Sequence, residues 1–281
     1  MVGAIQAGVQ DTIKITTNTS FYDNSYWIRI WVDFNNNLIF DDDENIYRGW
    51  AWDYGEGTIN AIITIPATQA AGDYRMRIGG CEYLQNENDP CLTGYLQAGY
   101  NDYTLRVLEM PVYTKDIAGH GGNNGGYYLI ASPVVDPIMP SEENGFITDT
   151  YDLYRFNPSH EDNEWENYKT FTNGYEIENG KGYLYASHDS TTLIFTGSPY
   201  NDNGEVILVY DATDERKCWN LVGNPFICEA ILDREYYVLN DDGKTINPNA
   251  VPATTPIPPF TAVFVKSVSI GDRVIFTKVV P

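Results

Sequence analysis

Residues 26–32 read YWIRIWV and residues 33–44 read DFNNNLIFDDDE, and this pair of segments decides how the first part of the chain folds. The first segment is apolar on both faces, which is typical of a central β-strand covered on each side. The second segment carries oxygen-bearing side chains at alternate positions. The boundary predicts a buried strand that runs directly into a polar loop.

The polar loop has the spacing of a calcium-binding loop. Calcium takes about six to eight oxygen ligands, and a short loop supplies them from side chains two residues apart and from a backbone carbonyl. With Asp33 as the first ligand, the EF-hand spacing predicts the metal ligands Asp33, Asn35, Asn37, Ile39 (through its carbonyl), Asp41 and Glu44. Calcium is the cofactor that this pattern indicates.

Leu38 departs from that pattern. It stands where an EF-hand loop has a glycine, which allows the sharp turn. Without glycine the loop is expected to be open, or to close without metal. The alternative is an acidic turn between two strands, with residues 41–44 solvated.

Short strands separated by turns predict an all-β fold of two β-sandwich domains in tandem. The expected strands of the first domain are 12–17, 26–32, 61–65, 74–78 and 102–109. Those of the second are 127–132, 153–156, 182–186, 193–196, 206–210, 220–222, 262–265 and 273–278. The glycine-rich run 118–126 reads as a flexible connection. The expected division is a first domain over 1–112, a linker over 113–126 and a second domain over 127–281.

The charge of the chain restricts its partners. It has 39 acidic and 17 basic residues and a formal net charge of -22. Such a field repels phosphate backbones and anionic membranes, so neither nucleic acid nor membrane insertion is expected. No apolar run approaches the length of a bilayer span. Met1 could be an expression start that replaces a removed export signal.

The four cysteines form two pairs with equal separation, Cys81 with Cys91 and Cys218 with Cys228. Local disulfides suit an exported protein, and we expect one between the first pair. The second pair flanks a strand that looks buried, where free cysteines are also common. Its pairing stays open.

No nucleophile elbow, His-Glu-x-x-His motif or phosphate loop is present in the sequence. His120, His160 and His188 fall in expected loops, which makes them poor candidates for a catalytic base. Any two of the many carboxylates would be an arbitrary choice for a glycosidase pair. We therefore expect no enzymatic activity.

Tryptophans suggest a second kind of site. Trp50 and Trp52 follow the acidic loop at a spacing that would put both rings on one strand face, and Trp165 is flanked by charged residues. Flat rings beside Asp and Asn are typical of sugar-binding surfaces. These three residues are the candidate ligand-binding side chains, and the alternative is that the first two cover the edge of the core. Trp27, Trp31 and Trp219 are expected in the core.

Several motifs of the first half occur together in one known family. They are WVDFNNN at 31–37, FDD at 40–42, IPA at 65–67, GDYRMR at 72–77, PC at 90–91 and DYTL at 102–105. In order and spacing, residues 5–108 resemble the GEVED domain, a β-sandwich module of bacterial secreted and surface proteins. Two departures stand out. The acidic signature run of the family is reduced to Asp102-Tyr103, and its Asp-Gly-Asp is here Asn37-Leu38-Ile39.

The second half carries GYYLIASP at 126–133, GKGYLYA at 180–186 and NLVGNPF at 220–226. Residues 114–281 resemble a β domain found near the C-termini of adhesins, peptidases and other exported bacterial proteins. The resemblance implies a secreted or cell-surface location and no catalytic residues. Together these features predict a non-catalytic extracellular adhesion or ligand-binding module, with a glycan or a host or bacterial surface protein as partner. The alternatives are an accessory carbohydrate-binding region of an exported hydrolase or peptidase, and a structural spacer.

Overall fold

The computed structural model describes residues 3–19, 25–52, 55–82, 90–91, 99–122, 125–160, 163–170 and 175–279. Within these ranges the regular structure consists of β-strands and four short 3₁₀ helices. The predicted all-β fold is therefore confirmed. The chain divides into two compact units, Met1–Met110 and Pro111–Pro281.

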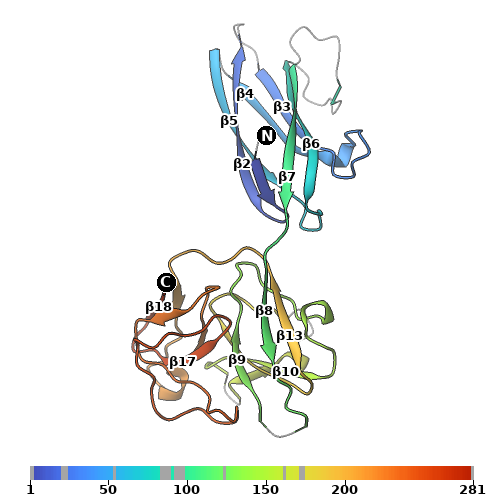
Figure 1. Ribbon diagram of the computed structural model, residues 1–281. Coiled ribbons are helices and arrows are strands. Elements are labelled where there is room, and N and C mark those ends of the chain that lie inside the picture. The colour runs from blue at the N-terminus through green and yellow to red at the C-terminus, as the bar shows by residue number, and fades with distance from the viewer. Residues whose placement is uncertain are drawn as a thin grey trace. The chain divides into compact units, whose positions relative to one another are not determined.

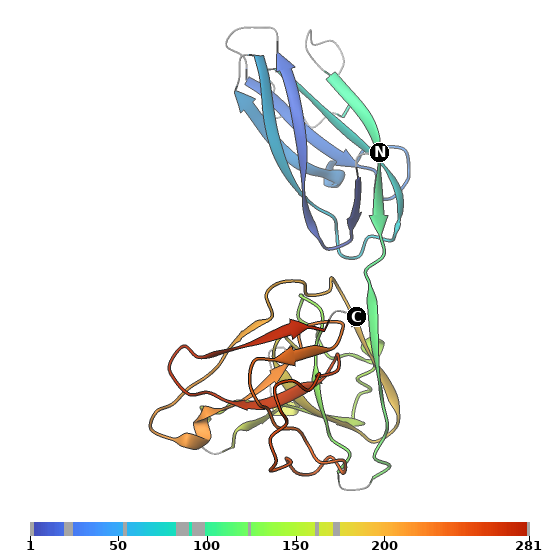
Figure 2. The ribbon, with the colours of Figure 1, turned by 60° about the vertical axis from the view of Figure 1, so that its left-hand side comes forward.

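Two layers of strands form the first unit (Figures 1 and 2). Its strands are β1 (Gly3–Gln6), β2 (Gln10–Thr19), β3 (Ser25–Val32), β4 (Asn45–Trp52), β5 (Gly55–Thr64), β6 (Gly72–Glu82) and β7 (Gly99–Leu108), and helix η1 is Asp42–Glu44. One layer is a five-stranded sheet in the order β1-β7-β6-β3-β4, and the other is the pair β2-β5. Strand β1 is parallel to β7, whereas the other pairs are antiparallel.

Strand β3 has the central position predicted from its sequence, because it pairs with β4 on one side and with β6 on the other. Ile28, Ile30 and Val32 point into the core between the layers, where they meet Ile63 of β5. On the opposite face of β3, Trp31 is also buried, with 1% exposed. This burial on both faces explains why the segment is apolar at nearly every position.

Strands of the second unit are shorter and are divided among small sheets. They are β8 (Val112–Ile117), β9 (Tyr128–Ala131), β10 (Tyr151–Phe156), β11 (Trp165–Asn167), β12 (Gly182–Ser187), β13 (Thr191–Thr196), β14 (Glu205–Ile207), β15 (Trp219–Gly223), β16 (Ala230–Leu232), β17 (Ala262–Lys266) and β18 (Arg273–Lys278). Helices η2, η3 and η4 are Glu142–Asn144, Tyr168–Thr170 and Glu215–Cys218. The sheets have the orders β11-β10-β12-β9, β13-β8, β14-β18-β16 and β15-β17.

The connection between the domains differs from the expected linker over 113–126. Residues 112–117 form β8, which pairs along its whole length with β13, so this part of the expected linker is an ordered strand of the second unit. The sequence VYTKDI alternates, and only the last residue, Ile117, is fully buried. Such a strand is difficult to recognise because its neighbour β13 lies far away in the sequence. The expected strand over 206–210 is also shorter, since β14 ends at Ile207.

An ion pair stabilises the loop before β18. The Arg234 guanidinium donates to both carboxylate oxygens of Asp272, with Nη1–Oδ2 and Nη2–Oδ1 distances of 2.9 and 3.0 Å. The Asp272 carboxylate also accepts the backbone N–H groups of Val268 and Arg273. These hydrogen bonds, that from Arg234 first, lower the pKa of Asp272 to about 2.

Candidate functional site

The predicted calcium loop lies between β3 and β4 and ends in helix η1. Asp33, its first residue, is fully buried with 0% exposed. Its backbone N–H donates to the Arg75 carbonyl of β6, which continues the sheet by one more pairing. The structure thus fixes the start of the loop to the edge of the core.

The Asp33 carboxylate organises the first turn of the loop. Oδ1 accepts the N–H of Asn37 at 3.1 Å, and Oδ2 accepts the N–H of Leu38 at 3.0 Å. Nη2 of Arg75 lies 3.6 Å from Oδ2 and donates to the Leu38 carbonyl at 2.6 Å. A buried carboxylate is costly unless it is paired and hydrogen-bonded, and these contacts meet that requirement.

Glu44 closes the loop from its other end. Oε1 accepts the N–H groups of Phe34 at 2.8 Å and Asn35 at 3.2 Å, while Oε2 accepts the N–H of Asp41 at 3.0 Å. Glu44 is itself buried, with 4% exposed. The first and last predicted ligands therefore accept hydrogen bonds from the backbone of the loop and fix its conformation.

The middle ligands contact one another. The side-chain amides of Asn35 and Asn37 both donate to Oδ2 of Asp41, at 3.1 and 3.0 Å. Their own oxygens accept backbone N–H groups, Asn35 Oδ1 from Asn37 at 2.9 Å and Asn37 Oδ1 from Ile39 at 2.7 Å. The structure therefore brings the five predicted side-chain ligands into one hydrogen-bonded network.

Leu38 makes the turn that was expected to need glycine. Its φ is 71°, and that of Asn36 is 55°, so both residues are left-handed. The left-handed conformation costs a residue such as leucine about 1–2 kcal/mol. The hydrogen bonds to the Asp33 carboxylate compensate for this strain, which explains how the loop closes without the family's glycine. Leu38 and Ile39 are 75% and 61% exposed.

By chemical type, the donor set fits a hard cation. It combines three carboxylates with two amide oxygens and one carbonyl, a mixture that calcium accepts. Among the residues that the structure describes, however, no group of three His, Cys, Asp or Glu side chains is arranged to hold a metal ion. In the described conformation the loop is closed by its own hydrogen bonds. A cation would have to replace the two amide hydrogen bonds on Asp41.

The contact of two arginines of β6 with Phe40 of the loop was missed by the sequence analysis. The guanidinium carbon of Arg75 lies 4.3 Å from the Phe40 ring centroid, and that of Arg77 lies 5.1 Å from it. Arg77 also forms a bidentate pair with Asp102 at 2.6 and 2.7 Å, which lowers the pKa of that carboxyl. In the sequence, these arginines belong to the GDYRMR motif and alternate with Tyr74, Met76 and Ile78 along β6.

Trp50 lies on the surface of β4 with 56% exposed. It stands directly across from Trp27 of β3, and the ring centroids are 6.5 Å apart. Trp27 is half-buried and is part of this surface pair, so its predicted place in the core is only partly met. Trp52 is the last residue of β4, and its side chain lies outside the described residues.

Trp165 belongs to β11 of the second unit and is half-buried. Its ring packs edge to face against Phe156 at 5.2 Å, Phe264 at 6.0 Å and Tyr154 at 6.4 Å. It is therefore anchored in a cluster of aromatic side chains and is not an isolated exposed ring. Trp219, which was predicted in the core, is also half-buried.

The structure describes only part of the two cysteine pairs. The side chain of Cys81 lies outside the described residues, so the predicted disulfide with Cys91 stays a prediction. Cys91 Sγ lies 3.3 Å from Nη1 of Arg77. Cys218 and Cys228 are both free thiols, the first buried and the second half-buried.

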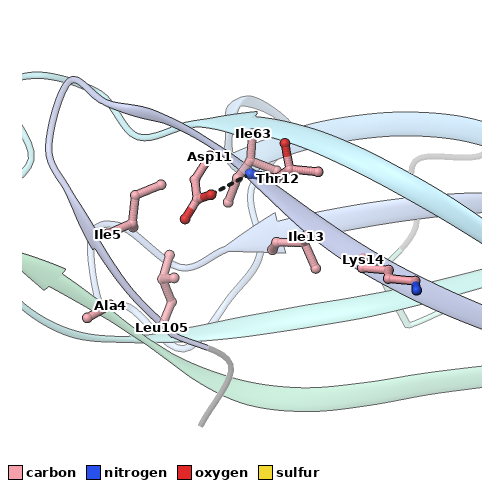
Figure 3. A pocket seen from close by; sticks show the side chains of 8 residues that line it. All are labelled: Ala4, Ile5, Asp11, Thr12, Ile13, Lys14, Ile63 and Leu105. Atoms are coloured by element: carbon pink, nitrogen blue, oxygen red, sulfur yellow. Dashed lines mark hydrogen bonds between the residues drawn. The ribbon is translucent and has the colours of Figure 1, made fainter. Parts of the chain in front are cut away.

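A small cavity of about 180 Å³ lies at one edge of the first unit (Figure 3). Its apolar wall comes from Ile5, Ile13, Ile63 and Leu105, which belong to four different strands. Asp11 lies beside it and accepts the backbone N–H of Thr12 at 2.7 Å. The cavity is thus lined by β1 and β7 of the five-stranded sheet and by the β2-β5 pair.

Comparison with known proteins supports the resemblance of the first half of the chain. The GEVED domain family matches residues 10–106, and these residues include the loop at residues 33–44. No curated protein matches the chain. Among solved structures, one similar chain is the class 5 fimbriae chaperone CfaA, with 9% identity, a TM-score of 0.25, and 75% of this chain and 90% of that chain covered.

The resemblance of residues 114–281 to a domain of exported proteins stays a prediction. Among the described residues, no helix is long and apolar enough to cross a membrane.

Proposed function

We propose that this chain is a non-catalytic, calcium-stabilised binding module of a secreted or surface-exposed bacterial protein. The observation that carries the proposal is the loop at residues 33–44, which is rich in oxygen atoms that can bind a metal. Two buried carboxylates, Asp33 and Glu44, accept backbone N–H groups from the loop and fix its two ends. The match of residues 10–106 to the GEVED domain supports the bacterial surface setting.

Calcium would have a structural role in this module. The loop concentrates the carboxylates of Asp33, Asp41 and Glu44, with Asp42 and Asp43 next to them. Arg75 is the cation that contacts the Asp33 end, at 3.6 Å. A divalent cation at the centre would reduce the repulsion among the carboxylates and fix the loop with its exposed Leu38 and Ile39.

Calorimetric calcium titration of the chelator-stripped protein tests this proposal. Asp41→Asn removes a carboxylate from the ligand set, whereas Asp43→Asn removes an exposed carboxylate from the same loop and serves as the matched control. We expect stoichiometric binding, weakened at least about tenfold by the first variant and little changed by the second. No binding at about millimolar calcium would refute the calcium role, since this is the weak end of extracellular calcium sites.

An accessory carbohydrate-binding region is the second candidate, favoured by the exposed Trp50 and its contact with Trp27. An aromatic pair on a sheet surface can stack against the apolar face of a sugar. Glycan-array binding that is lost in Trp50→Ala, but retained in Ile62→Ala, would favour it. Ile62 is a suitable control because it is 55% exposed on β5. A silent array would leave a host or bacterial surface protein as the partner, or a structural spacer.

A further inference from the structure

The second unit contains a cavity of about 540 Å³ whose wall combines aromatic rings with polar side chains. This volume lies within the range of small-molecule sites, about 300–1,000 Å³. The residues that matter for its chemistry are Tyr127, Tyr154, Asn163, Trp165, Lys244 and Thr245. It shares no residue with the loop at residues 33–44, so an inference about it does not depend on calcium.

Close backbone contacts hold this cavity in shape. The turn that precedes Lys244 lies against the segment before β9, where Gly126 N–H donates to the Asp242 carbonyl at 3.0 Å and Tyr127 N–H to the Gly243 carbonyl at 3.3 Å. A Cβ atom on Gly243 would lie 2.5 Å from the Tyr127 nitrogen, so the approach needs glycine. These contacts fix the side of the cavity formed by Tyr127 and Gly243, which reduces the ordering cost of binding there.

One side of the cavity is a series of aromatic rings. The Tyr127 and Tyr154 centroids are 6.4 Å apart, and Trp165 meets Tyr154 edge to face at 6.4 Å. Trp165 is in turn fixed against Phe156 and Phe264 of the core. Rings held in this way lose little side-chain entropy when a flat apolar surface stacks on them.

The polar groups at the rim are mainly donors. Asn163 Oδ1 already accepts the N–H of Trp165 at 3.0 Å, and in the described part of the chain neither its Nδ2 nor the Lys244 ammonium has a partner. Thr245 Oγ1 accepts from Asn240 at 2.6 Å, so its own proton can be donated. Burial, together with the neighbouring Tyr154 and Asp152, raises the pKa of Tyr127, which keeps that phenol protonated.

The composition of this wall is unusual for the chain. Although the protein has 39 acidic residues, the described lining of the cavity includes no Asp or Glu. The wall offers apolar rings and an excess of hydrogen-bond donors. A ligand complementary to this wall has a ring with an apolar C–H face and a substituent that accepts hydrogen bonds.

We propose that this cavity binds one sugar residue of a glycan whose ring carries an acceptor substituent, either an acetamido carbonyl or a carboxylate. The sugar ring stacks on the Trp165 and Tyr154 side of the cavity. Its acceptor substituent receives hydrogen bonds from Asn163 Nδ2 and Lys244 Nζ. The two substituents present the same chemistry to the wall, and the ligands of the test distinguish them.

Titration of the full chain with three trisaccharides, followed by tryptophan fluorescence and calorimetry, tests this site. The ligands are chitotriose, which carries acetamido groups, trigalacturonate, which carries carboxylates, and cellotriose, which carries neither. We expect saturable binding of chitotriose or trigalacturonate, and the one that binds identifies the substituent. Binding of cellotriose is expected to be at least about tenfold weaker, equivalent to the loss of one hydrogen bond.

Two variants assign the binding to this cavity. Lys244→Ala changes an exposed side chain, and Trp165→Phe keeps an aromatic ring in the core cluster, so both are expected to fold. Each should weaken binding at least about fivefold. The matched controls, Lys181→Ala and Trp219→Phe, lie in the same unit outside the cavity lining and should leave binding unchanged. The proposal is overturned by equal binding of cellotriose, by no saturation up to about 10 mM of any ligand, or by variants that bind like their controls.

Discussion

Replacing Glu44 by glutamine should destabilise the first unit strongly, because the carboxylate accepts N–H groups at both oxygens. In Glu44→Gln the amide oxygen can still accept from Phe34 and Asn35. The amide nitrogen then faces the N–H of Asp41, where two donors meet. Loss of one charge-assisted hydrogen bond costs about 1.5–3 kcal/mol, and weakening the other two adds up to about 1 kcal/mol. The expected loss is about 2–4 kcal/mol.

Differential scanning calorimetry in chelator measures this loss on the full chain. The two units are expected to give separable transitions, and that of Met1–Met110 should fall by about 8–16 °C, from about 4 °C per kcal/mol. Asp43→Asn, an exposed neighbour on the same short helix, should shift the transition by less than about 2 °C. If Glu44→Gln shifts the midpoint no more than this control, the hydrogen bonds of Glu44 do not hold the loop together and the reasoning is wrong.

Three further perturbations follow from backbone strain and charge. Leu38→Gly should raise stability in urea by about 0.5–1 kcal/mol because it relieves a φ of 71°, while Ile39→Gly, without a positive φ, should lower it; equal effects would contradict the strain argument. Asp272 has a pKa lowered to about 2, so its ion pair adds stability above the usual carboxyl pKa, and this stability is lost as pH falls through about 2. Asp272→Asn should therefore weaken the pH dependence of the second unit's urea midpoint between about pH 4 and 2. A midpoint that falls with pH as steeply as in the unsubstituted protein would contradict this. Gly243→Ala should lower the thermal midpoint of the second unit more than Gly271→Ala, since both have positive φ but only the first meets neighbouring atoms within 4 Å; equal shifts would show that the close approach is unimportant.

Strands with a strong local pattern could be predicted, whereas those defined by distant partners could not. Residues 26–32 were predicted as a central strand because both faces are buried, and β3 has that position. By contrast, β8 carries mixed polar and apolar residues. Its strand character depends on β13, a partner far away in the sequence that supplies the ladder hydrogen bonds. Pairing of this kind leaves little trace in a local window.

The candidate loop also combines features that are visible in the local sequence with features that depend on other segments. Its alternating oxygen donors are visible in the sequence, and the structure brings Asp33, Asn35, Asn37, Asp41 and Glu44 into one network. Its arginine neighbour could not be predicted, since Arg75 lies on another strand. Closure without glycine was one of the two expected outcomes, but its cause could not be predicted, because the hydrogen bonds that offset the strain at Leu38 come from the buried Asp33 carboxylate.

By itself the sequence determined the all-β class, the central strand of the first unit and the run of oxygen donors after it. These features depend on alternation and spacing within about a dozen residues, which the chain carries locally. Only the tertiary structure decided that Trp50 is exposed beside Trp27, and that Trp165 lines a cavity with Tyr127 and Lys244. Those residues come from separate segments and meet only when the sheets pack, so no local pattern specifies the cavity.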